Sequence, residues 1–129
     1  MGGPIKEMCT GNVLAVGDAG GHTIPTVGGG IPPGLVIGSI AGEAVADHVL
    51  ERKSLSEFDC AWRAEMGETL ENSLRIRRMS DVVFRNGRMI DWVTKMGWLT
   101  EEMIEKFILC EMDTKMRLVE KSLGIIGLG

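Results

Sequence analysis

The stretch that decides the fold is residues 12–34, Asn-Val-Leu-Ala-Val-Gly-Asp-Ala-Gly-Gly-His-Thr-Ile-Pro-Thr-Val-Gly-Gly-Gly-Ile-Pro-Pro-Gly. The apolar run Val13–Val16 predicts a buried strand of the kind found at the centre of a sheet, ending beside the carboxylate of Asp18. Pro32 and Pro33 predict the first turn of a helix, where no backbone donor is needed. Glycines let backbone N–H groups approach a ligand, and a helix N-terminus carries partial positive charge. The pattern is typical of a site for a polar cofactor.

The remainder of the chain predicts helices. The first runs through about Glu51 as a buried apolar helix, and glycines at every fourth position (34, 38 and 42) give it a bare stripe for close packing. A second helix follows Ser54 or Ser56, with one face buried through about Met79. Further helices are predicted from Ser80-Asp81, interrupted at Asn86-Gly87, then after Thr100, and from Asp113 to Leu123.

Composition limits the class of protein. The 129 residues are 44% hydrophobic and 25% charged, with a net charge of −4, so the chain can bury a core and nucleic-acid binding is not expected. Three widely spaced cysteines argue for reduced thiols in a cytoplasmic setting, and against a disulfide framework or a metal site. The apolar stretch after Gly30 is too short to cross a bilayer, which needs roughly 20 residues.

The 12–34 pattern resembles the second flavin-contacting motif of FAD-dependent oxidoreductases, and most of all that of the geranylgeranyl reductase group. The resemblance is specific over residues 2–52, Gly2-Gly3-Pro4 included, and weaker to the end of the chain. It implies that Gly17-Asp18 contacts FAD, with Asp18 accepting a hydrogen bond from a ribityl hydroxyl. It places Pro25 near the isoalloxazine ring. The glycines that precede the helix pointing at the pyrimidine side of the flavin would be Gly28, Gly29 and Gly30, with Ile31 following them.

Other interpretations of the same residues stay open. Asp18 could simply end a strand and cap a turn. His22 is a weak candidate for a catalytic proton donor, although a lone loop histidine is more often structural or solvated. Residues 28–34 approximate the dinucleotide fingerprint, but the third glycine falls one residue late and Pro25 makes the preceding segment a poor central strand. The methionines and tryptophans are interpreted as core residues. The alternative is that the methionines contact an isoprenoid chain and the tryptophans lie at a membrane interface.

The expected fold is mainly α with a short β segment: the C-terminal part of an α/β FAD-binding domain of the glutathione-reductase-like Rossmann type, followed by a helical region. Residues 1–53 would belong to the flavin domain and residues 54–129 to the helical region. The Gly-x-Gly-x-x-Gly unit that binds the ADP half of FAD and the substrate-walling sheet of that family are absent from the sequence. The chain is therefore expected to be a portion of such an enzyme that binds FAD weakly or not at all alone.

The resemblance implies an enzyme that reduces C=C bonds of isoprenoid chains by hydride transfer from reduced flavin. The expected partners are the N-terminal FAD and substrate portion or a second copy of the chain, with peripheral membrane contact as a further expectation. The alternatives are a non-catalytic helical interaction module that retains a relic flavin motif, and part of another flavoprotein such as a hydroxylase or a quinone-linked dehydrogenase.

Overall fold

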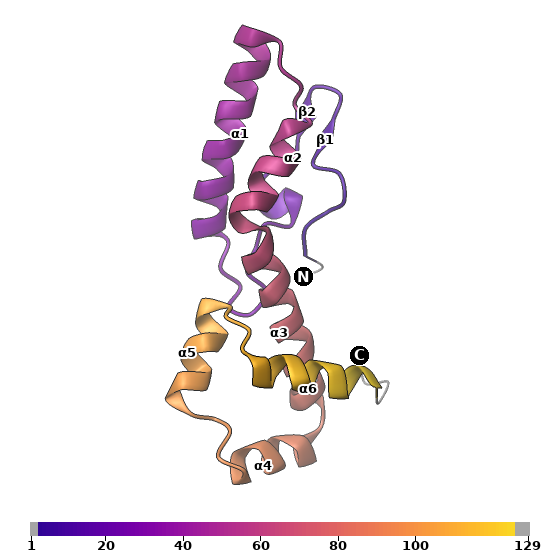
Figure 1. Ribbon diagram of the computed structural model, residues 1–129, viewed down its shortest axis with the longest axis vertical. Coiled ribbons are helices and arrows are strands. Elements are labelled where there is room, and N and C mark those ends of the chain that lie inside the picture. The colour runs from indigo at the N-terminus through magenta and orange to yellow at the C-terminus, as the bar shows by residue number, and fades with distance from the viewer. Residues whose placement is uncertain (1–2, 126–129) are drawn as a thin grey trace. The chain divides into compact units, whose positions relative to one another are not determined.

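The computed structural model describes residues 3–125, which are mainly helical (Figure 1). Gly2 of the predicted motif lies outside them. By internal packing the chain divides into one unit up to Glu71 and a second from Asn72. The predicted division after residue 53, which was drawn on the limits of a flavin domain, stays a prediction. Among the described residues no helix is long and apolar enough to span a membrane.

The first unit begins with a hairpin that sequence reasoning missed. Strand β1 (Cys9–Thr10) pairs with β2 (Val13–Leu14) in antiparallel register across a turn at Gly11, whose φ is +58°. Gly-Asn between two short strands is a signal for such a turn. The expectation of a buried central strand over Val13–Val16 was therefore wrong: β2 spans two residues, it pairs with β1 alone among the described residues, and Val13 is 69% exposed.

The core of the first unit lies between α1 (Ile31–Glu51) and α2 (Glu57–Trp62). Helix α1 contributes Ile37 and Ala41, and α2 contributes Phe58 and Trp62. Four-residue spacing places each pair on one side of its helix, so the two helices meet along these rows. The core cluster is completed by Met8 of the N-terminal segment and Leu70.

The opposite face of α1 is apolar and exposed. Positions 31, 35, 38, 42, 45 and 49 follow a spacing of four and three residues and so share one side of the helix. The large side chains on this side are exposed, among them Ile31 at 78% and Leu35 at 71%. At Gly34, Gly38 and Gly42 an added Cβ would meet no atom within 4 Å. The predicted helix was thus confirmed in its bounds, whereas the expectation that it is buried was wrong, because this apolar side is not covered by any of the described residues.

Helix α2 continues through a π turn, η2 (Arg63–Gly67), into α3 (Glu68–Arg85). In an uninterrupted α-helix, residues spaced by four drift around the axis by about 40° at each step. Over the twelve residues from Phe58 to Leu70 the drift would reach about 120° and would take Leu70 out of the core. The wider π turn offsets this rotation, so Phe58, Trp62 and Leu70 are all buried.

The second unit contains most of α3, α4 (Gly87–Lys95), α5 (Glu101–Leu109) and α6 (Thr114–Ile125). Asn86, Thr100 and Asp113 accept N-terminal backbone N–H groups of the three helices that follow them, which confirms the predicted starts after Thr100 and near Asp113. The predicted helix start at Ser80 was wrong, because α3 runs on to Arg85. The Ser80 hydroxyl donates to the carbonyl of Ile76, a bond within the helix that makes no cap.

Candidate functional site

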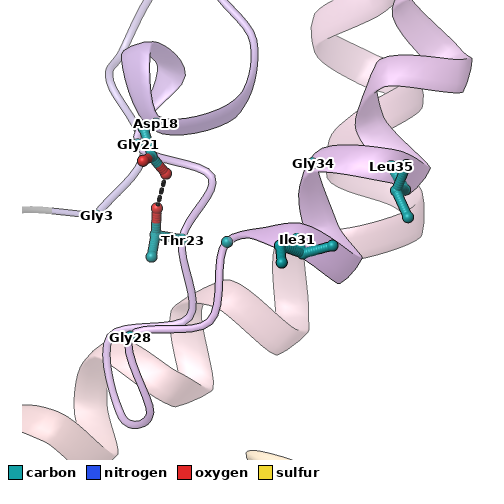
Figure 2. Close-up of a pocket in the computed structure, with 9 residues that line it drawn as sticks. Gly3, Asp18, Gly21, Thr23, Gly28, Ile31, Gly34 and Leu35 are labelled. Atoms are coloured by element: carbon teal, nitrogen blue, oxygen red, sulfur yellow. Dashed lines mark hydrogen bonds between the residues drawn. The ribbon is translucent and has the colours of Figure 1, made fainter.

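An open hollow of about 820 Å³ lies where the segment after β2 meets the start of α1 (Figure 2). Its lining is mostly backbone surface, because five of the nine lining residues are glycines. Asp18 supplies the one charged side chain of the lining, and Thr23 supplies a hydroxyl. The residues that line it are Gly3, Asp18, Gly21, Thr23, Gly28, Gly30, Ile31, Gly34 and Leu35.

The Asp18 carboxylate is held in a fixed orientation. Asp18 lies in a short 3-10 turn, η1 (Gly17–Gly20), and Thr23 Oγ1 donates to its Oδ1 at 2.6 Å. Figure 2 shows these two side chains pointing toward each other. Gly30 lies close to the same hydrogen bond, because an added Cβ would lie 3.0 Å from Asp18 Oδ1 and 3.7 Å from Thr23 Oγ1. Because an ionised carboxylate has about four acceptor positions, the bond from Thr23 leaves capacity for hydroxyl donors of a ligand.

Three glycines set the backbone conformation of residues 17–30, called here the site segment. Gly17, Gly21 and Gly28 have φ values of +66°, +72° and +69°, in the left-handed region that side chains disfavour. At Gly21 an added Cβ would also overlap the carbonyl of Gly3, so the N-terminal segment and the site segment touch through bare backbone. The amide of Ile5 donates to the carbonyl of Gly20 at 3.1 Å beside this contact. The N-terminal segment is thereby part of the wall of the hollow.

The N-terminus of α1 can act on a ligand through its partial positive charge and through a small number of backbone N–H donors. The first N–H groups of a helix lack intrahelical acceptors, and here Pro32 and Pro33 have no N–H. The N–H groups of Gly30 and Ile31 are therefore the donors that this helix end can provide. The macrodipole still places partial positive charge at the hollow, opposite in sign to Asp18. Exposed Ile31 and Leu35 add an apolar border to the same helix end.

The structure brings together four of the seven residues predicted to contact the cofactor: Asp18, Gly28, Gly30 and Ile31 line the hollow. Gly17, Pro25 and Gly29 are not among the lining residues. Gly17 accepts the amide of His22 through its carbonyl, and Gly29 pairs with Ile24 in a short bridge. Pro25 is buried. The roles of all seven toward a flavin stay predictions.

His22 lies in the core of the first unit. Its side chain is fully buried, its ring packs on Trp62 with centroids 4.8 Å apart, and neither ring nitrogen has a hydrogen-bond partner among the described residues. Burial, and then the nearby Arg63 guanidinium, lower the pKa of His22 below its ordinary value of 6.5, against a smaller opposing effect of Asp59. A neutral ring in this place anchors the site segment to α2.

Sequence reasoning missed Thr23, Gly3, Gly21 and Leu35 as members of the site. A signal existed for Thr23, since a hydroxyl five residues after Asp18 in a glycine-rich segment can fold back on the carboxylate. Leu35 follows Ile31 by one helical turn, which would place it at the same helix end. Gly3 belongs to the Gly2-Gly3-Pro4 stretch that the resemblance includes, but its contact with Gly21 depends on how the backbone folds and could not be read from the stretch itself.

The chain shares 37% identity over 83 residues with digeranylgeranylglycerophospholipid reductase 2 of Methanothermobacter thermautotrophicus, covering 61% of this chain and 22% of that protein. The digeranylgeranylglycerophospholipid reductase of Methanococcus vannielii is 36% identical over 81 residues, or 60% of this chain and 21% of the relative. A third such reductase, from Methanococcoides burtonii, is 33% identical over 79 residues, or 58% of this chain and 19% of the relative.

The chain is similar to digeranylgeranylglycerophospholipid reductases. The resemblance to the geranylgeranyl reductase group that the sequence indicates is thereby confirmed. The chain spans about a fifth of the length of the curated relatives it matches. No family model matches it, and no solved structure matches it.

Proposed function

We propose that this chain supplies a flavin-contacting segment of an FAD-dependent reductase that acts on the C=C bonds of isoprenoid chains. The observation that carries the proposal is the hollow, in which an oriented carboxylate faces a glycine-lined wall and a helix N-terminus. The names of the relatives support the reaction class, since these proteins are digeranylgeranylglycerophospholipid reductases.

The residues of the hollow fit a sugar-alcohol chain better than a phosphate. Asp18 would repel a phosphate, and no lysine or arginine lines this part of the described structure. A hydroxyl of a ribityl chain can instead donate to Asp18, in a charge-assisted hydrogen bond that is roughly twice as strong as a neutral one. Thr23 keeps the carboxylate in place while Gly30 leaves room beside it.

The start of α1 would act on the ring system of the flavin. Its partial positive charge stabilises negative charge that develops on a nearby group, and the N–H groups of Gly30 and Ile31 can donate to it. When bound and reduced, the flavin would supply a hydride to one alkene carbon, while a proton reaches the other carbon. The exposed side chains of Ile31 and Leu35 give the same border an apolar surface that excludes water.

The exposed apolar surface of the first unit indicates that the chain packs against another protein segment. The hollow is open, and the apolar side of α1 that carries Leu35, Gly38 and Gly42 has no cover within the described residues. Surfaces of this kind pack against protein. The remaining part of the flavoenzyme would cover both, and the chain alone should retain no FAD at useful affinity. A helical interaction module is the second candidate, favoured by exposed aromatic residues of the second unit such as Phe84 and Trp92.

A chimera tests the proposal. This chain would replace the matching segment of the M. thermautotrophicus relative, and bound FAD per protein would be measured by absorbance after desalting. Asp18→Asn should lower FAD retention by about tenfold or more, because it removes a charge-assisted acceptor. Glu7→Gln, which neutralises an exposed carboxylate away from the hollow, is the matched control. Equal FAD retention in the two variants, with a chimera that binds FAD, would remove Asp18 from the site.

A further inference from the structure

The short helix α4 exposes a tryptophan between two basic residues. Arg88, Trp92 and Lys95 are spaced by four and three residues, so they lie on one side of the helix, and all three are exposed. Trp98, in the turn after the helix, packs on Trp92 with ring centroids 5.9 Å apart. Trp92 is 51% exposed and Trp98 is 37% exposed. Two large aromatic rings thus meet at the surface and stay open to solvent.

The opposite side of α4 faces the unit. Ile90 and Val93 are half-buried and lie on the side away from Arg88 and Lys95. The helix therefore buries an ordinary apolar side and still presents tryptophans outward. Covering the interior of the second unit does not require those tryptophans.

The charged side chains near the two tryptophans in the sequence are mostly positive. Residues 84–99 carry Arg85, Arg88 and Lys95 against Asp91 alone, while the whole chain has a net charge of −4. Within the described residues none of these three cations is held in an ion pair. Unpaired cations beside exposed indole rings are complementary to a surface that is anionic outside and apolar beneath.

We propose that the exposed side of α4 with the turn after it, formed by Arg88, Trp92, Lys95, Met96 and Trp98 and called here the tryptophan face, docks on an anionic lipid surface. Indole rings are amphipathic and favour the level of the lipid headgroups. Arg88 and Lys95 would contact lipid phosphates on either side of Trp92. Met96, which is also exposed, adds an apolar side chain to the same face.

A second copy of the chain is a poorer occupant for the tryptophan face. A symmetric dimer would bring the face of one copy against the same face of the other, and so would set Arg88 and Lys95 against identical cations. Like charges brought together at an interface oppose association. An anionic lipid surface relieves this repulsion and accepts the same rings.

Vesicle sedimentation of the full chain tests the inference without flavin or substrate. The chain should pellet with vesicles of mixed phosphatidylcholine and phosphatidylglycerol, bind pure phosphatidylcholine at least about tenfold more weakly, and dissociate from the mixed vesicles at high salt. The double variant R88E/K95E should bind the mixed vesicles at least about tenfold more weakly than the unaltered chain. R88Q/K95Q, which removes the charges without reversing them, should show a smaller loss in the same direction.

The matched control is K115E/K121E, which makes the same change in net charge at two exposed positions of α6. It should bind the vesicles nearly as well as the unaltered chain, and far-ultraviolet circular dichroism should show equal helix content in all variants. Equal losses in the two double variants, equal binding to neutral and anionic vesicles, or no binding to either would overturn the inference. A concentration-dependent mass that W92A/W98A abolishes would overturn it in favour of a second copy.

Discussion

Lowering the pH should loosen the first unit through His22. Since the pKa of His22 in the folded chain lies below its ordinary value of 6.5, the unfolded chain takes up a proton first as the pH falls. The full stability is therefore present above about pH 6.5 and is lost progressively below it, down to the folded-state pKa. Unfolding free energy that falls as the pH is lowered is the behaviour expected of a histidine that is buried in its neutral form.

The size of the loss follows from the surroundings of the ring. Each unit by which the folded-state pKa is depressed removes about 1.4 kcal/mol of unfolding free energy once the pH is below both values. The ring is fully buried, its nitrogens have no partner among the described residues, and the Arg63 guanidinium lies over the Trp62 ring on which His22 packs. With an unfolded-state pKa of about 6.5, the loss between pH 7.5 and about pH 5 is limited to about 2 kcal/mol, and we expect a loss of about 1–2 kcal/mol over that range.

The chain offers a matched control, because its two histidines are His22 and His48. Urea unfolding would be followed by fluorescence in a W92F/W98F background, where Trp62 reports on the first unit. H22Q removes the titrating group and should flatten the pH dependence above pH 5, whatever its effect on stability at pH 7.5. H48Q alters the other histidine, whose Nδ1 lies 2.6 Å from the carbonyl oxygen of Lys53, and it leaves His22 in place, so the loss of stability that His22 causes should remain. Equal slopes in the unaltered chain and H22Q would refute the reasoning.

Three further predictions concern glycines. Gly30→Ala should lower FAD retention of the chimera by about tenfold, because its Cβ would crowd the Asp18 carboxylate; retention equal to the unaltered chimera would show that the carboxylate can move aside. Gly42→Ala should raise the unfolding free energy of the isolated chain by about 1 kcal/mol, since its Cβ meets no atom, and should lower the thermal stability of the chimera if that side of α1 is covered there. Gly21→Ala should cost about 1–3 kcal/mol in urea unfolding, because φ is positive and its Cβ would overlap the Gly3 carbonyl; a smaller loss would mean that the N-terminal segment yields.

Structural elements could be predicted from the sequence where they depend on residues that are neighbours along the chain. Helix α1 and the caps at Thr100 and Asp113 were predictable, because prolines, hydroxyls and carboxylates act on the residues beside them. Ser80 was misjudged because its hydroxyl could donate within a helix as well as cap one. The strand at Val13 was misjudged because apolar content was given more weight than the Gly-Asn turn before it.

The candidate site was predicted in part for the same reason. Asp18 and the glycines before α1 are local features of one motif, and four of the predicted residues line one hollow. The burial of His22 depends on Trp62, which lies forty residues further along the chain, so no local pattern could place its ring. The contact between Gly3 and Gly21 is likewise set by the folded path of the backbone.

The π turn between α2 and α3 accommodates one residue more than a regular α-helix would need to bring Leu70 to the side of Trp62. Deleting one residue from Arg63–Gly67 would restore regular α-helical winding, and the seven-residue spacing then left between Trp62 and Leu70 corresponds to about two full turns, so both side chains would stay on one side of the helix. Side chains on the solvent side of this stretch can change with little effect on the core. Homologous chains that keep this core should therefore either keep the π turn or lack one residue between Trp62 and Leu70 and have a regular α-helix there, whereas the gain of a residue would rotate Leu70 away from Trp62.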